Sequence, residues 1–141
     1  MTNAPGSLIV VGIDGSEASK HALRWAVRQA EQTGAELVAL TAWHLPEMYG
    51  YVSRDYDVDA ANMLEGVLKE VLDPPPPVTE RSRVVEGRAA SVLIEASKDA
   101  DLLVVGTRGH GGFEGMLLGS VSQHTVQHAA CPVVVVPRPK S

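Results

Sequence analysis

The sequence predicts an α/β fold built on an open, parallel sheet of five strands with helices on both faces. Two observations lead to this prediction. Apolar, β-branched runs without polar alternation recur along the chain, which is typical of strands covered by helices on both faces. Segments with apolar residues at helical spacing stand between them, and such crossovers join parallel strands. We expect one domain over residues 1–141 with its core at about 8–137, since 141 residues can bury a core of their own.

The first strand is predicted at residues 8–13 and the first helix after it. Residues 14–16 (Asp-Gly-Ser) offer N-cap side chains. Alanines then recur every fourth residue from Ala18 to Ala30, so that this helix can approach a sheet closely. Gly34 suits the left-handed position just past the helix end.

The next strand–helix–strand unit is predicted from residue 36 to residue 86. Residues 36–43 form the second strand, and residues 57–72 form a helix that the prolines at 74–77 must end. Residues 78–86 mix Val with charged and hydroxyl side chains, so this strand is expected at a sheet edge where water meets one face. Gly87 breaks it.

The last elements are a helix at 89–98, a central strand at 101–106, a helix at 119–129 and a strand at 132–136. Residues 44–56 are left as a long connection that either folds over a ligand or caps the sheet edge. The plain cap is the expectation.

Composition excludes several classes of function. The net charge of −5 argues against a broad surface for nucleic acid or an anionic membrane, and no apolar run approaches the roughly 20 residues of a spanning helix. The single cysteine, Cys131, fits a reducing compartment, so we expect a cytoplasmic protein. Residues 1–7 lack the features of a secretory signal and are expected to form a loose tail.

A pattern of glycines follows the fourth strand. Gly106 and Gly109 form a turn, and nine residues separate Gly109 from Gly119-Ser120. Glycine removes the Cβ that keeps phosphates away from backbone amides. The first amides of the helix after Gly119 lack intrahelical acceptors, and the helix dipole adds to their attraction for anions. The hydroxyls of Ser120 and Ser122 are expected to add donors, and we predict a phosphate site here.

The alternative is that these glycines only make tight loops. The segment lacks the Gly-Lys-Ser or Gly-Lys-Thr of the common phosphate loop, and the first strand lacks the third glycine of a dinucleotide fingerprint. Asp14 either caps the first helix or contacts the ligand. Arg108 either reaches a phosphate or remains solvated.

Other reactive side chains are given ordinary roles. His110, His124 and His128 have neither the spacing of a metalloprotease helix nor a cysteine pair beside them, so we expect surface or helix positions. Cys131 is expected to be a small buried hydrophobe.

The glycine pattern resembles the hallmark of the universal stress protein family, in particular its ATP-binding branch. The hallmark is Gly, two residues, Gly, nine residues and Gly-Ser, and it is matched from Gly106 to Ser120. Residues 11–16 and 131–136 are also similar to that family. The resemblance implies strand order 3-2-1-4-5 and a Rossmann-like, adenine nucleotide alpha hydrolase-like fold.

The resemblance also implies a ligand, ATP with or without Mg²⁺, in the crevice where the direction of winding reverses. It implies contacts of Asp14 with the ribose or adenine, of the backbone near Ala42 with the adenine, and of Gly109 and residues 119–122 with the phosphates. The candidate binding residues are Ile13, Asp14, Gly15, Ala42, Gly106, Thr107, Arg108, Gly109, Gly119, Ser120, Val121 and Ser122.

The strand Val133–Val136 is apolar, and a bare apolar edge invites pairing with another chain. The resemblance implies a homodimer formed in this way, and a strand covered within its own monomer is the alternative.

The main functional hypothesis is a regulatory module of a stress response, in which bound ATP stabilises one arrangement of loop 107–118 and of the dimer surface. Two alternatives stay open. One is a slow ATP hydrolase or nucleotidyl-transfer enzyme, with Asp14 as its candidate carboxylate. The other is a nucleotide-free protein interaction module. Backbone donors accept any phosphate, so the sequence does not rank ATP against ADP, AMP or a cyclic nucleotide.

Overall fold

The computed structural model describes residues 7–45, 55–107 and 119–138. Most of the expected N-terminal tail, the middle of the 44–56 connection and the loop after Thr107 lie outside these ranges. The described elements are β1 (Leu8–Gly12), α1 (Glu17–Thr33), β2 (Glu36–Trp43), α2 (Tyr56–Val71), β3 (Glu80–Glu86), α3 (Ala89–Ser97), β4 (Leu102–Gly106), α4 (Ser120–His128) and β5 (Val133–Val136).

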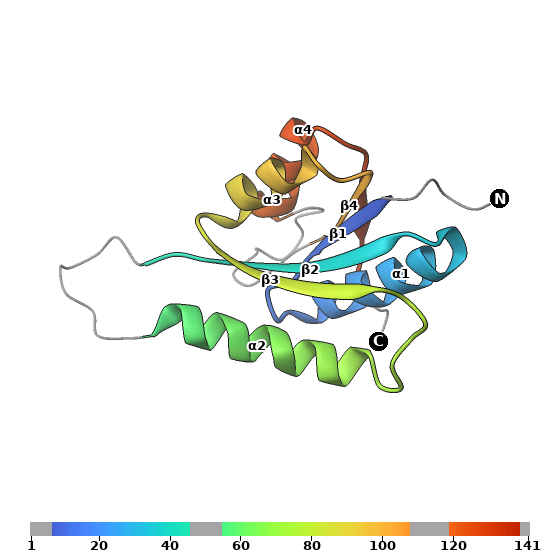
Figure 1. Ribbon diagram of the computed structural model, residues 1–141. Coiled ribbons are helices and arrows are strands. Elements are labelled where there is room, and N and C mark those ends of the chain that lie inside the picture. The colour runs from blue at the N-terminus through green and yellow to red at the C-terminus, as the bar shows by residue number, and fades with distance from the viewer. Residues whose placement is uncertain (1–6, 46–54, 108–118, 139–141) are drawn as a thin grey trace.

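All five strands are parallel and lie in the order β3-β2-β1-β4-β5. This confirms the predicted fold class and strand order. The chain winds outward from β1 to β3 and then returns to β4 on the other side of β1, so the direction of winding reverses between β1 and β4. Helices α1 and α2 cover one face of the sheet, and α3 and α4 cover the other (Figure 1).

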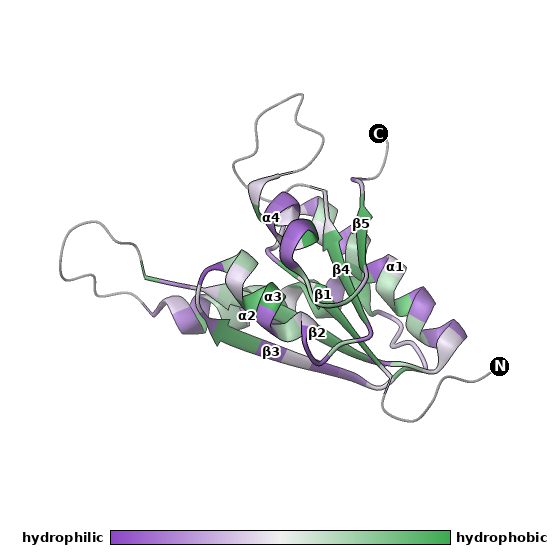
Figure 2. Ribbon diagram, turned by 90° about the horizontal axis from the view of Figure 1, so that it is seen from above, coloured by the Kyte–Doolittle hydropathy of each residue, from purple (hydrophilic) through white to green (hydrophobic). Residues whose placement is uncertain are grey.

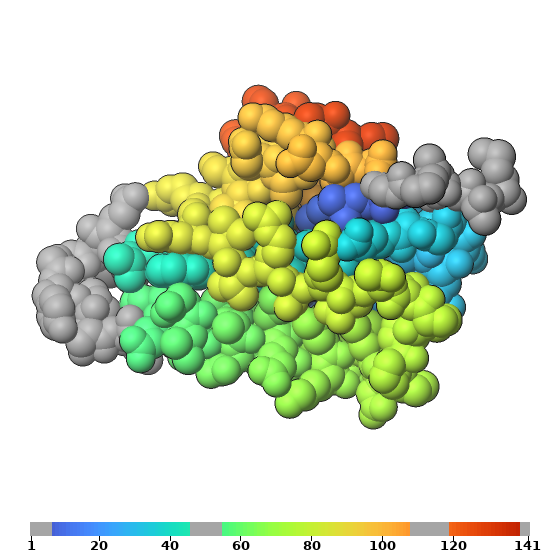
Figure 3. All heavy atoms as spheres, in the orientation of Figure 1, coloured from blue at the N-terminus to red at the C-terminus, as the bar shows by residue number. Residues whose placement is uncertain are grey.

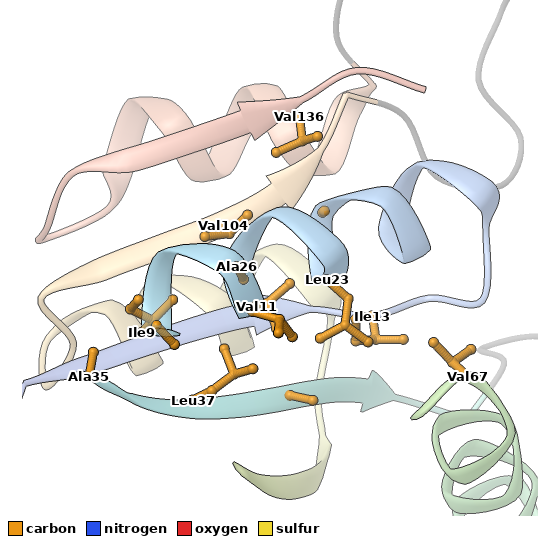
Figure 4. Packing of buried hydrophobic residues seen from close by; sticks show 14 of the residues in the cluster. Ile9, Val11, Ile13, Leu23, Ala26, Ala35, Leu37, Val67, Val104 and Val136 are labelled. Atoms are coloured by element: carbon orange, nitrogen blue, oxygen red, sulfur yellow. The ribbon is translucent and has the colours of Figure 1, made fainter. Parts of the chain in front are cut away.

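The side chains of the strands contribute to two hydrophobic cores, one on each face of the sheet. Ile9 and Val11 of β1 pack in the cluster that contains side chains of α1 and α2, whereas Val10 packs in the cluster that contains side chains of α3. Leu23 and Ala26 of α1 lie next to Val11 in the first cluster (Figure 4). Because successive side chains of a strand point to opposite faces, a strand covered on both faces needs apolar residues at every position.

Strand β3 is the polar edge that the sequence predicts. Its side chains from Arg81 to Arg83 are exposed, and Figure 2 shows hydrophilic positions along it. The strand begins two residues later than predicted because Val78 is held in a turn, with its amide donating to the carbonyl of Pro76 at 2.9 Å. In Figure 3, α2 packs beneath β3 and leaves its outer edge open in this view.

Helix α1 has a defined beginning and end. The Ser16 hydroxyl caps it by accepting a hydrogen bond from the amide of Ser19 at 3.1 Å. Gly34 adopts the predicted left-handed conformation, with φ of 76°, and its amide donates to the carbonyl of Ala30. The cap is therefore Ser16, and the alternative that Asp14 caps this helix is wrong.

The predicted alanine stripe is fully buried, with 0% exposure at Ala18, Ala22 and Ala26 and 1% at Ala30. The closest approach is at the end of β4. A Cβ added to Gly106 would lie 2.8 Å from the Cβ of Ala18 and 2.9 Å from its carbonyl carbon. Since backbone atoms cannot move aside as a side chain can, Gly106 is required for α1 to sit where it does.

No helix in the described ranges has the length and apolar character needed to cross a membrane.

We expect Gly106→Ala to lower the free energy of unfolding by about 1 to 3 kcal/mol, because the added methyl group overpacks the contact with Ala18. Gly66→Ala is the matched control, since nothing lies within 4 Å of a Cβ added at that helical position and alanine is favoured over glycine in a helix by about 1 kcal/mol. Urea denaturation measures both. Equal stability of Gly106→Ala and the wild type would contradict the packing role.

Candidate functional site

A cavity of about 260 Å³ opens where β1 and β4 end. Its walls come from both faces of the sheet, because α1 approaches from one face and α3 and α4 from the other. Open α/β sheets bind ligands at such a reversal of winding. The lining residues are Gly12, Ile13, Asp14, Ser16, Ser19, Leu40, Ala42, Ala89, Val92, Leu93, Val105, Gly106, Gly119, Ser120, Val121 and Ser122.

The structure brings most of the predicted site residues together around this cavity. Those that line it are Ile13, Asp14, Ala42, Gly106, Gly119, Ser120, Val121 and Ser122. Gly15 and Thr107 are not part of its lining. Arg108 and Gly109 lie outside the described residues.

Asp14 is held by the turn that leads into α1. Its Oδ1 accepts hydrogen bonds from the amide of Ser16 at 2.9 Å and from the Ser16 hydroxyl at 2.5 Å. Gly15 lies between them with φ of 86°, a conformation that favours glycine. Gly15 thus shapes the turn, while Asp14 is exposed and lines the cavity.

The end of β1 is fixed by a buried hydroxyl of β2 that sequence reasoning missed. Thr41, which is 2% exposed, donates from Oγ1 to the carbonyl of Ile13 at 2.9 Å. The amide of Ile13 in turn donates to the carbonyl of Leu40 at 2.9 Å. These two hydrogen bonds fix the backbone of Ile13, the residue that follows β1, and so position Asp14. The signal in the sequence was a hydroxyl residue among the apolar residues from 37 to 43.

The start of α4 supplies the polar end of the cavity. The amides of Ser120, Val121 and Ser122 belong to the first helical turn, where no intrahelical carbonyl is available, and no described side chain caps this helix. The Ser120 side chain is exposed at the same position. This end of the cavity therefore presents aligned donors and the positive end of a helix dipole.

Two donors near the start of α4 are already engaged within the protein. The Ser122 hydroxyl, in a residue that is 5% exposed, donates to the carbonyl of Gly106 at 2.5 Å. The amide of Gly119 donates to the carbonyl of Thr107 at 2.7 Å. The expectation that the Ser122 hydroxyl is an open donor is therefore wrong. Both bonds instead fasten the beginning of α4 to the end of β4.

The structure also gives a different reason why residue 106 must be a glycine. Sequence reasoning assigned this glycine to a close approach of phosphate, whereas the atoms that exclude a Cβ there belong to Ala18. Gly106 still lines the cavity. The main effect of its missing side chain is that α1 can pack closely against the end of β4.

Apart from Ala42, the residues at the apolar end of the cavity were missed by sequence reasoning. Leu40 of β2 and Val92 and Leu93 of α3 form this end, together with Gly12, Ala42, Ala89 and Val105. A Cβ on Gly12 would lie 3.1 Å from Leu93 Cδ2, so this glycine keeps the wall close to the sheet. These residues have the pattern of ordinary core positions, and only the tertiary structure shows that they also face a cavity. The cavity thus suits a ligand with a flat apolar part and an anionic part.

The remaining candidate side chains lie away from this cavity. His124 and His128 are exposed on α4, as expected for ordinary helix positions, and His110 lies outside the described residues. Cys131 is only partly buried, which corrects the expectation of a buried position. Burial, with a smaller contribution from the Asp101 carboxylate, raises the pKa of the Cys131 thiol, so the thiol stays protonated and weakly reactive at neutral pH.

Comparison with known proteins gives relatives in sequence and in structure. A universal stress protein of Mycolicibacterium smegmatis is 39% identical over 136 residues, which cover 94% of this chain and 46% of that protein. The chain spans about half the length of the curated relatives it matches.

Two solved structures show the same fold with a nucleotide bound. A universal stress protein in complex with cAMP superposes with a TM-score of 0.72 at 29% identity, covering 94% of this chain and 98% of that one. The universal stress protein of Archaeoglobus fulgidus in complex with dAMP has a TM-score of 0.69 at 20% identity, with 92% and 97% coverage.

The glycine pattern, the strand order and these relatives agree with a match to a protein-family model. Residues 7–137 fit the model of the universal stress protein family. The chain belongs to the universal stress protein family.

Proposed function

We propose that this chain binds an adenine nucleotide, with ATP as the physiological ligand, and acts as a regulatory module in a stress response. The observation that carries the proposal is the cavity between β1 and β4, which joins an apolar wall to the first turn of α4. The solved relatives in complex with cAMP and with dAMP support it.

The adenine is proposed to lie against the apolar end. Leu40, Val92 and Leu93 offer aliphatic surface there, and burial of a flat ring against such surface is favourable in proportion to the area removed from water. Ala42 also lines the cavity, and its backbone is proposed to contact the adenine. Asp14 is proposed to accept a hydrogen bond from a ribose hydroxyl, while Ser16 holds its carboxylate in position.

The phosphates are proposed to lie at the start of α4. The amides of residues 120–122 and the Ser120 hydroxyl supply donors, so a chain of net charge −5 holds an anion without a basic surface. Arg108 and Gly109 are proposed to complete this end. If Mg²⁺ accompanies ATP, the phosphates would be its main ligands, because Asp14 is the one carboxylate among the described lining residues.

We favour binding over rapid hydrolysis. Phosphoryl transfer needs groups that hold metal and orient the attacking water. Among the described lining residues, Asp14 alone is ionisable, and its Oδ1 is already engaged by Ser16.

The β5 edge is proposed to join two copies of the chain. The carbonyls of Pro132 and Val136 accept hydrogen bonds from the amides of Leu103 in β4 and of Thr107 just after it, at 3.0 Å each. In a parallel strand alternate residues bond to opposite sides, so the backbone groups of Val133 and Val135 face away from β4. Their side chains are only partly buried, and an open apolar edge of this kind favours pairing with a second copy.

The variant Ser120→Glu tests phosphate binding separately from the thermal stability of the protein. A carboxylate in the first turn of α4 favours the helix dipole but repels a phosphate, so we expect ATP affinity to fall at least about tenfold, or about 1.4 kcal/mol. Adenosine affinity and the thermal midpoint are expected not to fall. Isothermal titration with both ligands, alongside thermal melting, measures this.

Gln123→Glu is the matched control, since Gln123 is exposed on the same helix and does not line the cavity. It adds the same charge to the chain and is expected to leave ATP binding nearly unchanged. Absence of ATP binding by the wild type at about 1 mM ligand would remove the proposal. If Ser120→Glu binds ATP as tightly as the wild type does, the phosphates do not lie at the start of α4.

Val135→Pro tests the dimer, because it removes an amide that faces the open edge and leaves the ladder to β4 intact. We expect a dimeric wild type and a folded, monomeric variant by light scattering and circular dichroism. Val134→Pro is the control, since it removes an amide that faces β4 and should lower the free energy of unfolding through the loss of a ladder hydrogen bond. A monomeric wild type, or a Val135→Pro variant that remains dimeric, would contradict this interface.

A further inference from the structure

Two histidine side chains on α4 lie together outside the nucleotide cavity. His124 and His128 are four residues apart and exposed, and their ring centroids are 4.6 Å apart with the ring planes tilted by 48°. Neither lines the cavity. Within the described ranges the rings of His21 and His44 bond to backbone carbonyls, whereas the two on α4 make no hydrogen bond to a described residue. Both side chains are thus exposed, and no described residue bonds to their ring nitrogens.

Residues four apart on a helix lie on one face, one turn above the other. Neutral imidazole is a common ligand for transition metals. Two rings that share one metal through bonds of about 2.0 to 2.1 Å must have centroids about 4.5 to 5 Å apart. The observed separation of 4.6 Å lies within this range.

The position on the helix also favours a cation. His128 is the last residue of α4, and the C-terminal end of a helix carries partial negative charge. The net charge of the whole chain is −5. A divalent cation at this end therefore meets no unfavourable field from the helix or from the overall charge of the protein.

We propose that His124 and His128 form a binding site for one divalent transition metal of the Cu²⁺, Ni²⁺ or Zn²⁺ class, with water in the remaining coordination positions. Imidazole ligands select these metals over Mg²⁺ and Ca²⁺, which prefer oxygen. The described residues contain no group of three or more His, Cys, Asp or Glu that could hold a metal ion. With two protein ligands, the ion is exchangeable and does not form part of the folded core.

A metal held across one turn also stabilises the helix that carries it. Helix α4 has nine residues and no side-chain cap among the described residues, and short helices depend on such added contacts. Metal binding to the folded state alone raises the thermal midpoint, and the rise grows with the logarithm of the free metal concentration once this exceeds the dissociation constant. The two histidines lie outside the lining of the nucleotide cavity.

The test uses the full chain, free of any histidine tag, titrated with Ni²⁺ by calorimetry and followed by thermal melting. We expect one Ni²⁺ per chain and a raised thermal midpoint. His124→Ala and His128→Ala should each weaken Ni²⁺ binding at least about tenfold, because each loses the second arm of a chelate, and should abolish the thermal shift. Mg²⁺ should produce neither effect.

Two control variants distinguish this pair from other ligands of the chain. His44→Ala removes an exposed histidine elsewhere, and Cys131→Ser removes the free thiol; both should bind Ni²⁺ as the wild type does. Circular dichroism of each variant establishes that α4 and the sheet remain folded. Wild-type affinity in the double variant His124→Ala/His128→Ala, a loss of binding in either control, or no Ni²⁺ binding up to about 1 mM would overturn the site.

Discussion

The close contact between α1 and the end of β4 is the constraint on which the site depends. Gly106 has no room for a Cβ because Ala18 lies against it. The same glycine accepts a hydrogen bond on its carbonyl from Ser122 of α4 and pairs in register with Val136 of β5. One position thus joins a helix from each face of the sheet to the end of a central strand. The location of the cavity follows from this junction.

The cavity has a polar part and an apolar part, and a different helix contributes to each. Helix α4 contributes its amino end, where backbone donors are aligned and unsatisfied by the helix itself. Helix α3 contributes apolar side chains that belong to the second hydrophobic core, among them Val92 and Leu93. An anion and a flat ring can therefore be held side by side by a protein of net negative charge. The binding chemistry comes from backbone geometry more than from charged side chains.

Local sequence patterns were sufficient for most of the fold. The strand predicted at residues 36–43 has the bounds of β2 in the structure, and the polar mixture after Val78 indicated an edge strand. The alanine stripe of α1 indicated close packing because small residues at a spacing of four have few other uses. Strand order came from the family resemblance, since nothing in local periodicity says which strands are neighbours.

The parts of the site that were missed depend on contacts between distant residues. Gly106 was assigned to the ligand because its steric conflict with Ala18 arises only when α1 folds back on β4. Thr41 and Ser122 form hydrogen bonds to carbonyls 28 and 16 residues away, and a single sequence shows no sign of such partners. Val92 and Leu93 have the spacing of core residues, and they are core residues that also border an opening.

The central claim is that the first-turn amides of α4 hold the anionic part of the ligand. The most direct measurement is amide chemical-shift perturbation by NMR during parallel titrations with AMP and with adenosine. The account predicts that the amides of Ser120, Val121 and Ser122 shift strongly with AMP and far less with adenosine, while residues at the apolar end, such as Leu93, shift with both. Binding of AMP that leaves those three amides unmoved would contradict it.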